Sequence, residues 1–150
     1  MIRDDIKAAL VNAMKSGDKQ GTAAIRLIQA AIKNRDIELR TASQTPDDDV
    51  IVTEVLQKMI KQRRESIELY DKGGRPELAD AERGEVAVIE RFLPQQMSED
   101  EARAAIQAIV AELGASSVKD MGRVMAALKE RHAGQIDMSK ASGLVKEALA

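Results

Sequence analysis

The side chains that could do chemistry in this chain are few and far apart. His132 is the only histidine, and there is no cysteine, so thiolate metal sites and cysteine nucleophiles are excluded. His132 follows Arg131 near an expected helix end, where a cation interacts with the last carbonyls and the helix dipole. The sequence has no Walker motif and no GxGxxG motif. We therefore expect no stand-alone catalysis, no metal site and no cofactor.

Two short polar clusters suggest chemistry but also have structural explanations. Ser116, Ser117 and Lys119 resemble a serine–lysine pair, yet no nucleophile turn or glycine-rich oxyanion loop accompanies them. Helix capping explains the serines better. The aspartates at 47–49 could hold a cation, but Thr45 as cap with Pro46 in the first turn places them where a helix dipole favours acids.

The composition favours helices and narrows the partners. Charged residues make up 32% of the chain, and helix-forming residues are abundant. The net charge of −2 disfavours non-specific binding of nucleic acid, and Tyr70 and Phe92 alone offer no platform for stacking bases. The acidic, amphipathic start of the sequence leads us to expect no signal peptide, and there is no apolar run of membrane-spanning length. We expect a soluble, cytoplasmic monomer that does not enter membranes.

Apolar residues at helical spacing predict a first helix over residues 2–16, which ends at Gly17. They predict a second helix that Asp18 caps and that extends to about Arg40. In the first, Ile2, Ile6, Leu10, Ala13 and Met14 form the side expected to be buried. On the second helix, a cation recurs every seven residues. If the helix is straight, these cations stay within about 60° of one another around its axis. This row consists of Lys19, Arg26, Lys33 and Arg40. It could face phosphates, or it could simply be a solvated face, which is the commoner role of charged helix rows.

A long helix after residue 46 ends at Gly73-Gly74, and a returning helix with Leu78 on its apolar side extends to about Leu93. Together they predict a helical hairpin. Its first helix carries the densest basic cluster of the chain, formed by Lys58, Lys61, Arg63 and Arg64. Because Arg63 falls on the apolar side, we expect it to pair with a carboxylate across the helix interface rather than to contact a ligand.

Pro94 interrupts the helical pattern, and Ser98 with Glu101 then offers a capping box. We therefore predict an all-α protein of two domains. Residues 1–93 form a bundle of about four helices that includes the hairpin, and residues 94–150 form a small three-helix domain. In the latter, a helix capped by Ser117 contains Gly122, and this glycine costs about 1 kcal/mol relative to alanine. We expect another backbone or a ligand to come close there.

Four segments carry a resemblance to a known family: residues 26–34, 60–66, 91–96 and 116–125. In order and spacing they resemble the stand-alone GatB/YqeY-type proteins over essentially the whole chain. The second half is also similar to the C-terminal tail domain of GatB, a component of the glutamine-dependent aspartyl/glutamyl-tRNA amidotransferase. That similarity rests on Gly122-Arg123-Val124-Met125 and on the pattern of residues 144–149.

The resemblance implies an all-helical protein whose tail-like half helps to hold tRNA while chemistry takes place on other domains. The catalytic cradle of GatB is absent, so carbon–nitrogen ligase activity with glutamine as amide donor is implied only by association. Our leading hypothesis is a tRNA-associated accessory module without catalysis of its own. The residues expected to meet the tRNA backbone are Lys119, Gly122, Arg123, Lys140 and Lys146.

Two alternatives remain. The hairpin, with Arg63 and Arg64, could dock a protein partner such as an amidotransferase or an aminoacyl-tRNA synthetase. A weaker alternative is genuine amide transfer from glutamine as part of a complex. In either case Lys58, Lys61, Arg63 and Arg64 form a secondary basic surface.

Overall fold

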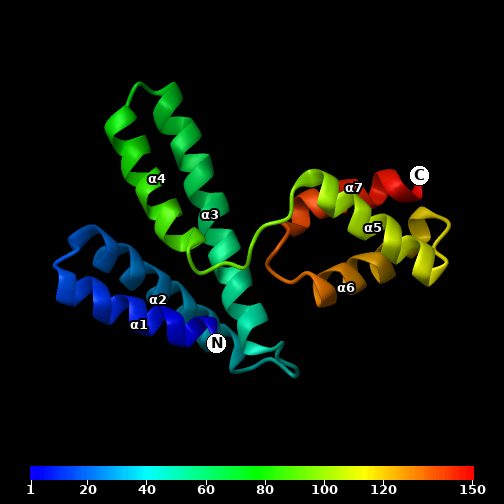
Figure 1. Cartoon of the computed structure of the whole chain (residues 1–150), viewed down its shortest axis with the longest axis horizontal. Coiled ribbons are helices and arrows are strands. Elements are labelled where there is room, and N and C mark those ends of the chain that lie inside the picture. Colours follow the sequence, from blue (N-terminus) through cyan, green and yellow to red (C-terminus); the bar gives the residue numbers. More distant parts are fainter. The chain divides into compact units, whose positions relative to one another are not determined.

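The computed structural model describes all residues from 1 to 150, and it is entirely helical, which confirms the predicted fold class (Figure 1). The helices are α1 (Ile2–Ser16), α2 (Lys19–Leu39), α3 (Asp48–Lys72), α4 (Pro76–Glu90), α5 (Glu99–Leu113), α6 (Met121–Arg131) and α7 (Met138–Leu149). Contacts within the chain divide it into two compact units, Met1–Leu93 and Pro94–Ala150. None of the helices is both long and apolar enough to span a bilayer.

The turn between α1 and α2 follows the prediction. Gly17 adopts a left-handed conformation with φ of 74°, which glycine reaches without steric cost, and it ends α1. The Asp18 carboxylate then accepts a hydrogen bond from the Gly21 N–H at 2.9 Å and caps α2. α1 and α2 therefore pack as a helical hairpin.

The start of α3 differs from the prediction. Thr45 was expected as the cap with Pro46 in the first turn, but α3 begins at Asp48 with Asp47 at the capping position. No side chain caps it. The proline disfavours helical angles at Thr45, and the first-turn acids Asp48 and Asp49 instead contact α1. Tertiary contacts, rather than a local cap, therefore set this boundary.

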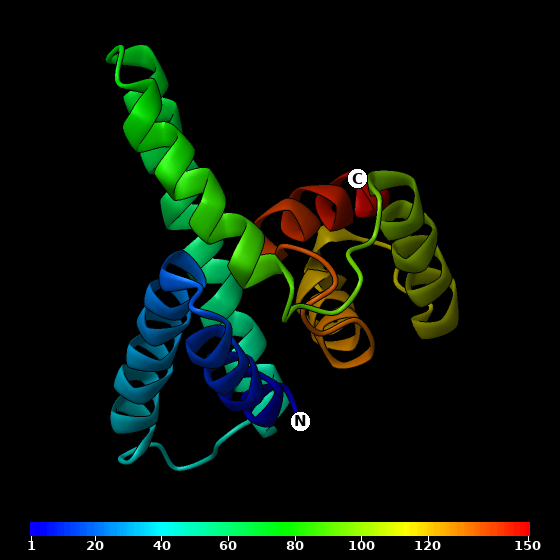
Figure 2. The ribbon, with the colours of Figure 1, turned by 60° about the vertical axis from the view of Figure 1, so that its left-hand side comes forward.

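α3 and α4 form the predicted hairpin. Figure 1 and Figure 2 both show its connecting turn projecting beyond α1 and α2. α4 ends at Glu90, three residues before the expected end at Leu93. Leu78 was expected on the buried side, but it is exposed, because it lies near the projecting end where fewer elements can cover it.

The core of the first unit contains residues from all four helices: Ile6, Ile25, Ile28, Ile32, Val52, Leu56, Met59 and Ile89. Among these, Ile6 was predicted to be buried. Met14 was also expected inside, but its side chain is 48% exposed because it lies on the outer side of α1, beside Arg26 of α2.

The second unit has its own core, made of residues from α5, α6 and α7. The predicted capping box is confirmed: the Glu101 N–H donates to Ser98 Oγ at 3.1 Å, and the Ser98 N–H donates to Glu101 Oε1 at 3.4 Å. The Met97 N–H donates to the Gln135 carbonyl at 3.0 Å, which ties the start of the unit to the α6–α7 turn. The largest fully buried side chains are Ile106, Ile109, Val124, Leu128 and Val145.

Candidate functional site

The residues expected to meet tRNA all lie in the second unit, at the start of α6 and along α7. Lys119 is in a 3₁₀ turn, Val118–Asp120, that leads directly into α6. Gly122 and Arg123 follow in the first turn of α6. All three are exposed to solvent. Lys119 and Arg123 are thus within about one helical turn of each other.

The Asp120 carboxylate organises this turn. It accepts hydrogen bonds from the Ser116 N–H at 2.9 Å and the Ser117 N–H at 3.4 Å. Its other oxygen pairs with Arg123 Nη2 at 2.8 Å. These contacts hold the pKa of Asp120 below its usual value, with the Ser116 N–H as the largest cause and Arg123 next. Asp120 fixes the loop, but it also partly neutralises Arg123.

The surroundings of Gly122 differ from the prediction. The glycine was expected inside a helix capped by Ser117, with another backbone or a ligand close to it. Instead, the 3₁₀ turn precedes α6, and Gly122 is only the second residue of that helix. A methyl group added at Gly122 would meet no atom within 4 Å. No other part of the chain covers this backbone, so it faces open space.

Lys140 and Lys146 on α7 do not point in the same direction. Six residues separate them, which places them about 9 Å apart along the axis and about 120° apart around it. Lys140 lies near Glu99 of α5, whose pKa is lowered chiefly by Arg103 and, to a smaller extent, by Lys140. Lys146 is exposed and makes no ion pair. The structure therefore groups Lys119 with Arg123, while the α7 lysines lie on separate faces.

The two arginines of the basic cluster on the hairpin form internal ion pairs. Arg63 Nε lies 2.7 Å from Glu85 Oε2 and 3.9 Å from Glu82 Oε2, both on α4, and only 15% of the arginine side chain is exposed. This confirms the expected carboxylate partner across the helix interface. Arg64 Nη2 pairs with Glu90 Oε1 at 2.9 Å. Lys58 and Lys61 remain exposed.

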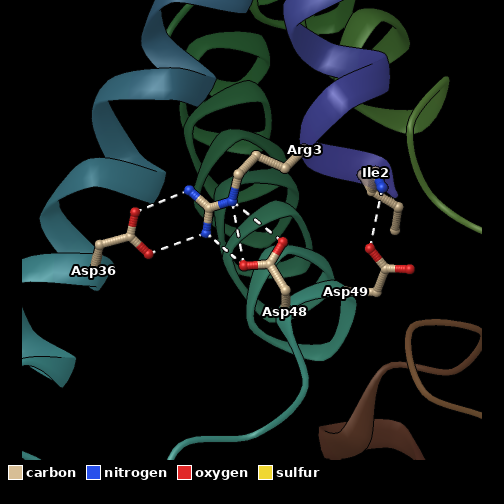
Figure 3. A network of polar contacts seen from close by, with 5 residues as sticks. All are labelled: Ile2, Arg3, Asp36, Asp48 and Asp49. Carbon is tan, nitrogen blue, oxygen red and sulfur yellow. Dashed lines mark hydrogen bonds and ion pairs between the residues drawn. The ribbon is translucent and has the colours of Figure 1, made fainter.

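A network in the first unit was not foreseen from the sequence. Figure 3 shows Arg3 of α1 between two carboxylates. Its Nη1 lies 2.9 Å from Asp36 Oδ2 of α2, and its Nη2 lies 2.8 Å from Asp48 Oδ1 of α3. These contacts raise the pKa of Arg3, with the Asp36 hydrogen bond as the largest cause. The backbone N–H of Ile2 donates to Asp49 Oδ1 at 3.0 Å. Two of the three clustered aspartates thus join helices.

His132 has a structural environment. It occupies the position after α6, and its backbone N–H donates to the Leu128 carbonyl at 2.9 Å. Its Nδ1 lies 3.0 Å from Gln135 Oε1.

The second unit also has an open depression of about 350 Å³, lined by Gln107, Val110, Ala111, Gly114, Ala115 and Ala148. No titratable side chain lines it, so it offers no group for acid–base chemistry.

These features define an all-helical protein with exposed cations at the start of α6. Comparison with known sequences gives the family. Residues 3–149 match the family described as Yqey-like protein, and the chain belongs to it. This is the family of domains like the C-terminal domain of GatB.

Several fungal proteins are similar to this chain. The mitochondrial protein named altered inheritance of mitochondria protein 41 from Saccharomyces cerevisiae is 32% identical over 90 residues, covering 60% of this chain and 47% of that protein. Its namesake in Eremothecium gossypii is 33% identical over 59% of this chain and 46% of its own length. An uncharacterized protein of Schizosaccharomyces pombe is 31% identical over 62% of this chain and 72% of its own length. The matched part is about half the length of the first two relatives.

Proposed function

We propose that this protein is a tRNA-associated accessory module whose second unit binds the tRNA backbone without catalysis of its own. The observation that carries the proposal is the start of α6, where Lys119 and Arg123 flank the uncovered backbone at Gly122. Backbone and shape contacts suit a chain with almost no aromatic residues. Membership of a family of GatB tail-like domains supports tRNA as the ligand.

The test is an anisotropy titration of the full chain with bulk tRNA at about 50 and 200 mM salt, a range over which several phosphate contacts weaken steeply. We expect Lys119→Glu combined with Arg123→Glu to weaken tRNA binding. The slope of the logarithm of affinity against the logarithm of salt concentration should fall by about 2, one for each lost phosphate contact. A matched control is Lys7→Glu with Lys15→Glu on α1, which makes the same charge change on the first unit.

A second variant, at Asp120, should change tRNA affinity in the opposite direction. Asp120→Asn can still accept the Ser116 N–H, but it removes the negative charge that pairs with Arg123. We expect it to tighten tRNA binding about twofold or more, since Arg123 becomes free to meet a phosphate. Circular dichroism checks that the variants fold like the native protein. If they do, and if both the Lys119→Glu/Arg123→Glu variant and the Asp120→Asn variant bind tRNA with unchanged affinity, this site is wrong.

A second candidate function is a protein-interaction module that docks an amidotransferase or a synthetase through the hairpin. Leu69, at 69% exposed, favours it because it is the most exposed large apolar side chain of the chain and lies near the projecting end of the hairpin. Leu69→Glu should abolish co-purification with such a partner after nuclease treatment. Retention of the partner by this variant would count against the hairpin as the docking surface.

A further inference from the structure

The second helix carries a row of cations that have no carboxylate partner within ion-pair distance. Lys19, Arg26, Lys33 and Arg40 are all exposed, and none makes an ion pair. Most of the arginines elsewhere have a carboxylate within 4.0 Å; they are Arg3, Arg35, Arg63, Arg64, Arg75, Arg83, Arg103, Arg123 and Arg131. These four cations thus form a line of unpaired charge along one side of α2, while exposed lysines elsewhere, such as Lys7 and Lys58, are also unpaired.

The spacing of this row is regular. Seven residues correspond to about 10 Å along a helix and to a drift of about 20° around it. The four cations therefore form a nearly straight line about 30 Å long. The buried residues of α2, such as Ala24, Ile28 and Ile32, belong to the opposite side of the helix.

A second row, of apolar residues, runs parallel to the cations. Ala23, Ala30 and Ile37 each follow a cation by four residues, which places them about 40° further around the helix. Leu27 lies beside them. The Ile37 side chain is 45% exposed and that of Leu27 is 47% exposed. Leu27 and Ile37 lie about 15 Å apart along the axis with Ala30 between them, so the row forms an apolar stripe rather than one compact patch.

The apolar surface continues onto α1. A depression of about 340 Å³ lies where α1 meets α2, and its lining includes Met14, Thr22, Ala23 and Arg26. Arg26 Nη2 lies 3.7 Å from Met14 Sδ, so the exposed methionine adjoins the cationic row. We use the name α2 face for Lys19, Ala23, Arg26, Leu27, Ala30, Lys33 and Ile37 of α2 together with Arg40, which directly follows the helix.

We propose that the α2 face docks an amphipathic helix of a partner protein whose apolar stripe is flanked by carboxylates. Four unpaired cations in line complement a row of acids, and a seven-residue repeat is the period at which two packed helices keep the same sides in contact. The small side chains of Ala23 and Ala30 permit close approach. Nucleic acid would also meet the cations, but it would not account for exposed Leu27 and Ile37.

The probe is a synthetic helix of the length of α2, with leucine at its a and d positions and glutamate at its e and g positions. Its matched control has lysine in place of every glutamate. We expect the full chain to bind the acidic helix and not the basic one in a fluorescence anisotropy titration. Arg26→Glu with Lys33→Glu should weaken binding by about tenfold or more, because attraction becomes repulsion at two positions.

Two further variants test the two components of the α2 face. Ile37→Asp should also weaken binding severalfold, whereas Lys58→Glu with Lys61→Glu, an equal charge change on α3, should leave it unchanged. Circular dichroism confirms that each variant is folded. If Ile37→Asp binds as tightly as the native chain, the association is only electrostatic and apolar docking is wrong.

The remaining outcomes also decide the question. Absence of binding to the acidic helix, or equal binding of the basic helix, overturns the proposal. So does a result in which the Arg26 and Lys33 reversal spares the acidic helix but abolishes binding to bulk tRNA or to phosphatidylglycerol vesicles. That last result would assign the α2 face to a phosphate-bearing ligand. The proposal concerns the first unit only, so its failure leaves the tRNA site on α6 standing.

Discussion

Arg63 illustrates how a half-buried cation is accommodated in the hairpin. Its side chain is tied to Glu85 at 2.7 Å, with Glu82 at 3.9 Å, and its Nη1 donates to the Met59 carbonyl at 3.4 Å. Removing one partner of such a pair leaves an uncompensated charge, whereas replacing both partners with apolar residues does not. A single and a double replacement should therefore differ in their effect on stability.

We expect Glu85→Ala to lower the free energy of unfolding by about 1–2 kcal/mol, because Glu82 compensates Arg63 only in part. Arg63→Met combined with Glu85→Leu should change it by less than about 1 kcal/mol, because both members of the close pair are then replaced by apolar residues. Urea unfolding of both variants, followed by circular dichroism, measures the difference. A larger loss for the double variant than for Glu85→Ala would mean that the ion pair itself stabilises the hairpin.

The Arg3 network makes stability depend on pH in acid. The Arg3 guanidinium lowers the pKa of Asp36, with their hydrogen bond as the largest cause. A carboxyl group whose pKa is depressed by folding stabilises the native state above its unfolded pKa of about 3.9. That contribution is lost as the pH falls through the lower pKa of folded Asp36.

Arg3→Met should accordingly reduce the free energy of unfolding by about 0.5–1 kcal/mol at neutral pH, a small value because the Asp36 side chain is 41% exposed and water screens it. The difference from the native chain should shrink as the pH falls below about 4. Urea unfolding between pH 7 and pH 3 measures it. Arg40→Met is the control, since Arg40 is the smallest of the causes that lower the pKa of Asp36. A difference that persists unchanged at pH 3 would contradict the charge pairing.

Sequence reasoning foresaw one of these two residues for a physical reason. Arg63 interrupts an apolar stripe on its own helix, so the need for a partner is visible locally. The partners of Arg3 are Asp36 and Asp48, which are 33 and 45 residues away. No local pattern marks such a pairing, because it exists only once α1, α2 and α3 have packed together.

At the scale of elements, the boundaries set by local chemistry were predictable and the others were not. Gly17, Asp18 and Ser98 act within one turn of their helices, and each has the expected role. The start of α3 depends on contacts with α1 and was placed too early. The start of α6 was also placed too early, since the residues after Ser117 form a tighter 3₁₀ turn first.

Gly122, near the start of α6, allows a prediction about the stability of this helix. Since a methyl group there would meet no atom within 4 Å, Gly122→Ala should stabilise the second unit by up to about 0.5–1 kcal/mol through helix propensity and a less flexible unfolded chain. The same variant should weaken tRNA binding if phosphates approach this backbone. Thermal unfolding and the tRNA titration measure the two effects. A destabilised Gly122→Ala variant would show that the surroundings of α6 are tighter than described.

At the scale of the whole molecule, the chain has two separate apolar cores. Ile28 is fully buried in the first and Ile106 in the second, and no residue belongs to both clusters. Units of this size bury a modest fraction of their surface and are only marginally stable, so loss of one large core side chain is a severe change. The two cores should therefore fail separately.

We expect Ile28→Ala and Ile106→Ala each to cost about 2–4 kcal/mol, but in different transitions. Tyr70 is the only tyrosine, tryptophan is absent, and α3 places Tyr70 in the first unit, so its fluorescence follows that unit alone. Circular dichroism follows both units. In urea, Ile28→Ala should move the Tyr70 transition to lower concentration, while Ile106→Ala should leave it in place and shift only the remaining helix signal. A shift of the Tyr70 transition in Ile106→Ala would mean that the cores are energetically coupled, and any tRNA binding by the second unit would then depend on the integrity of the first.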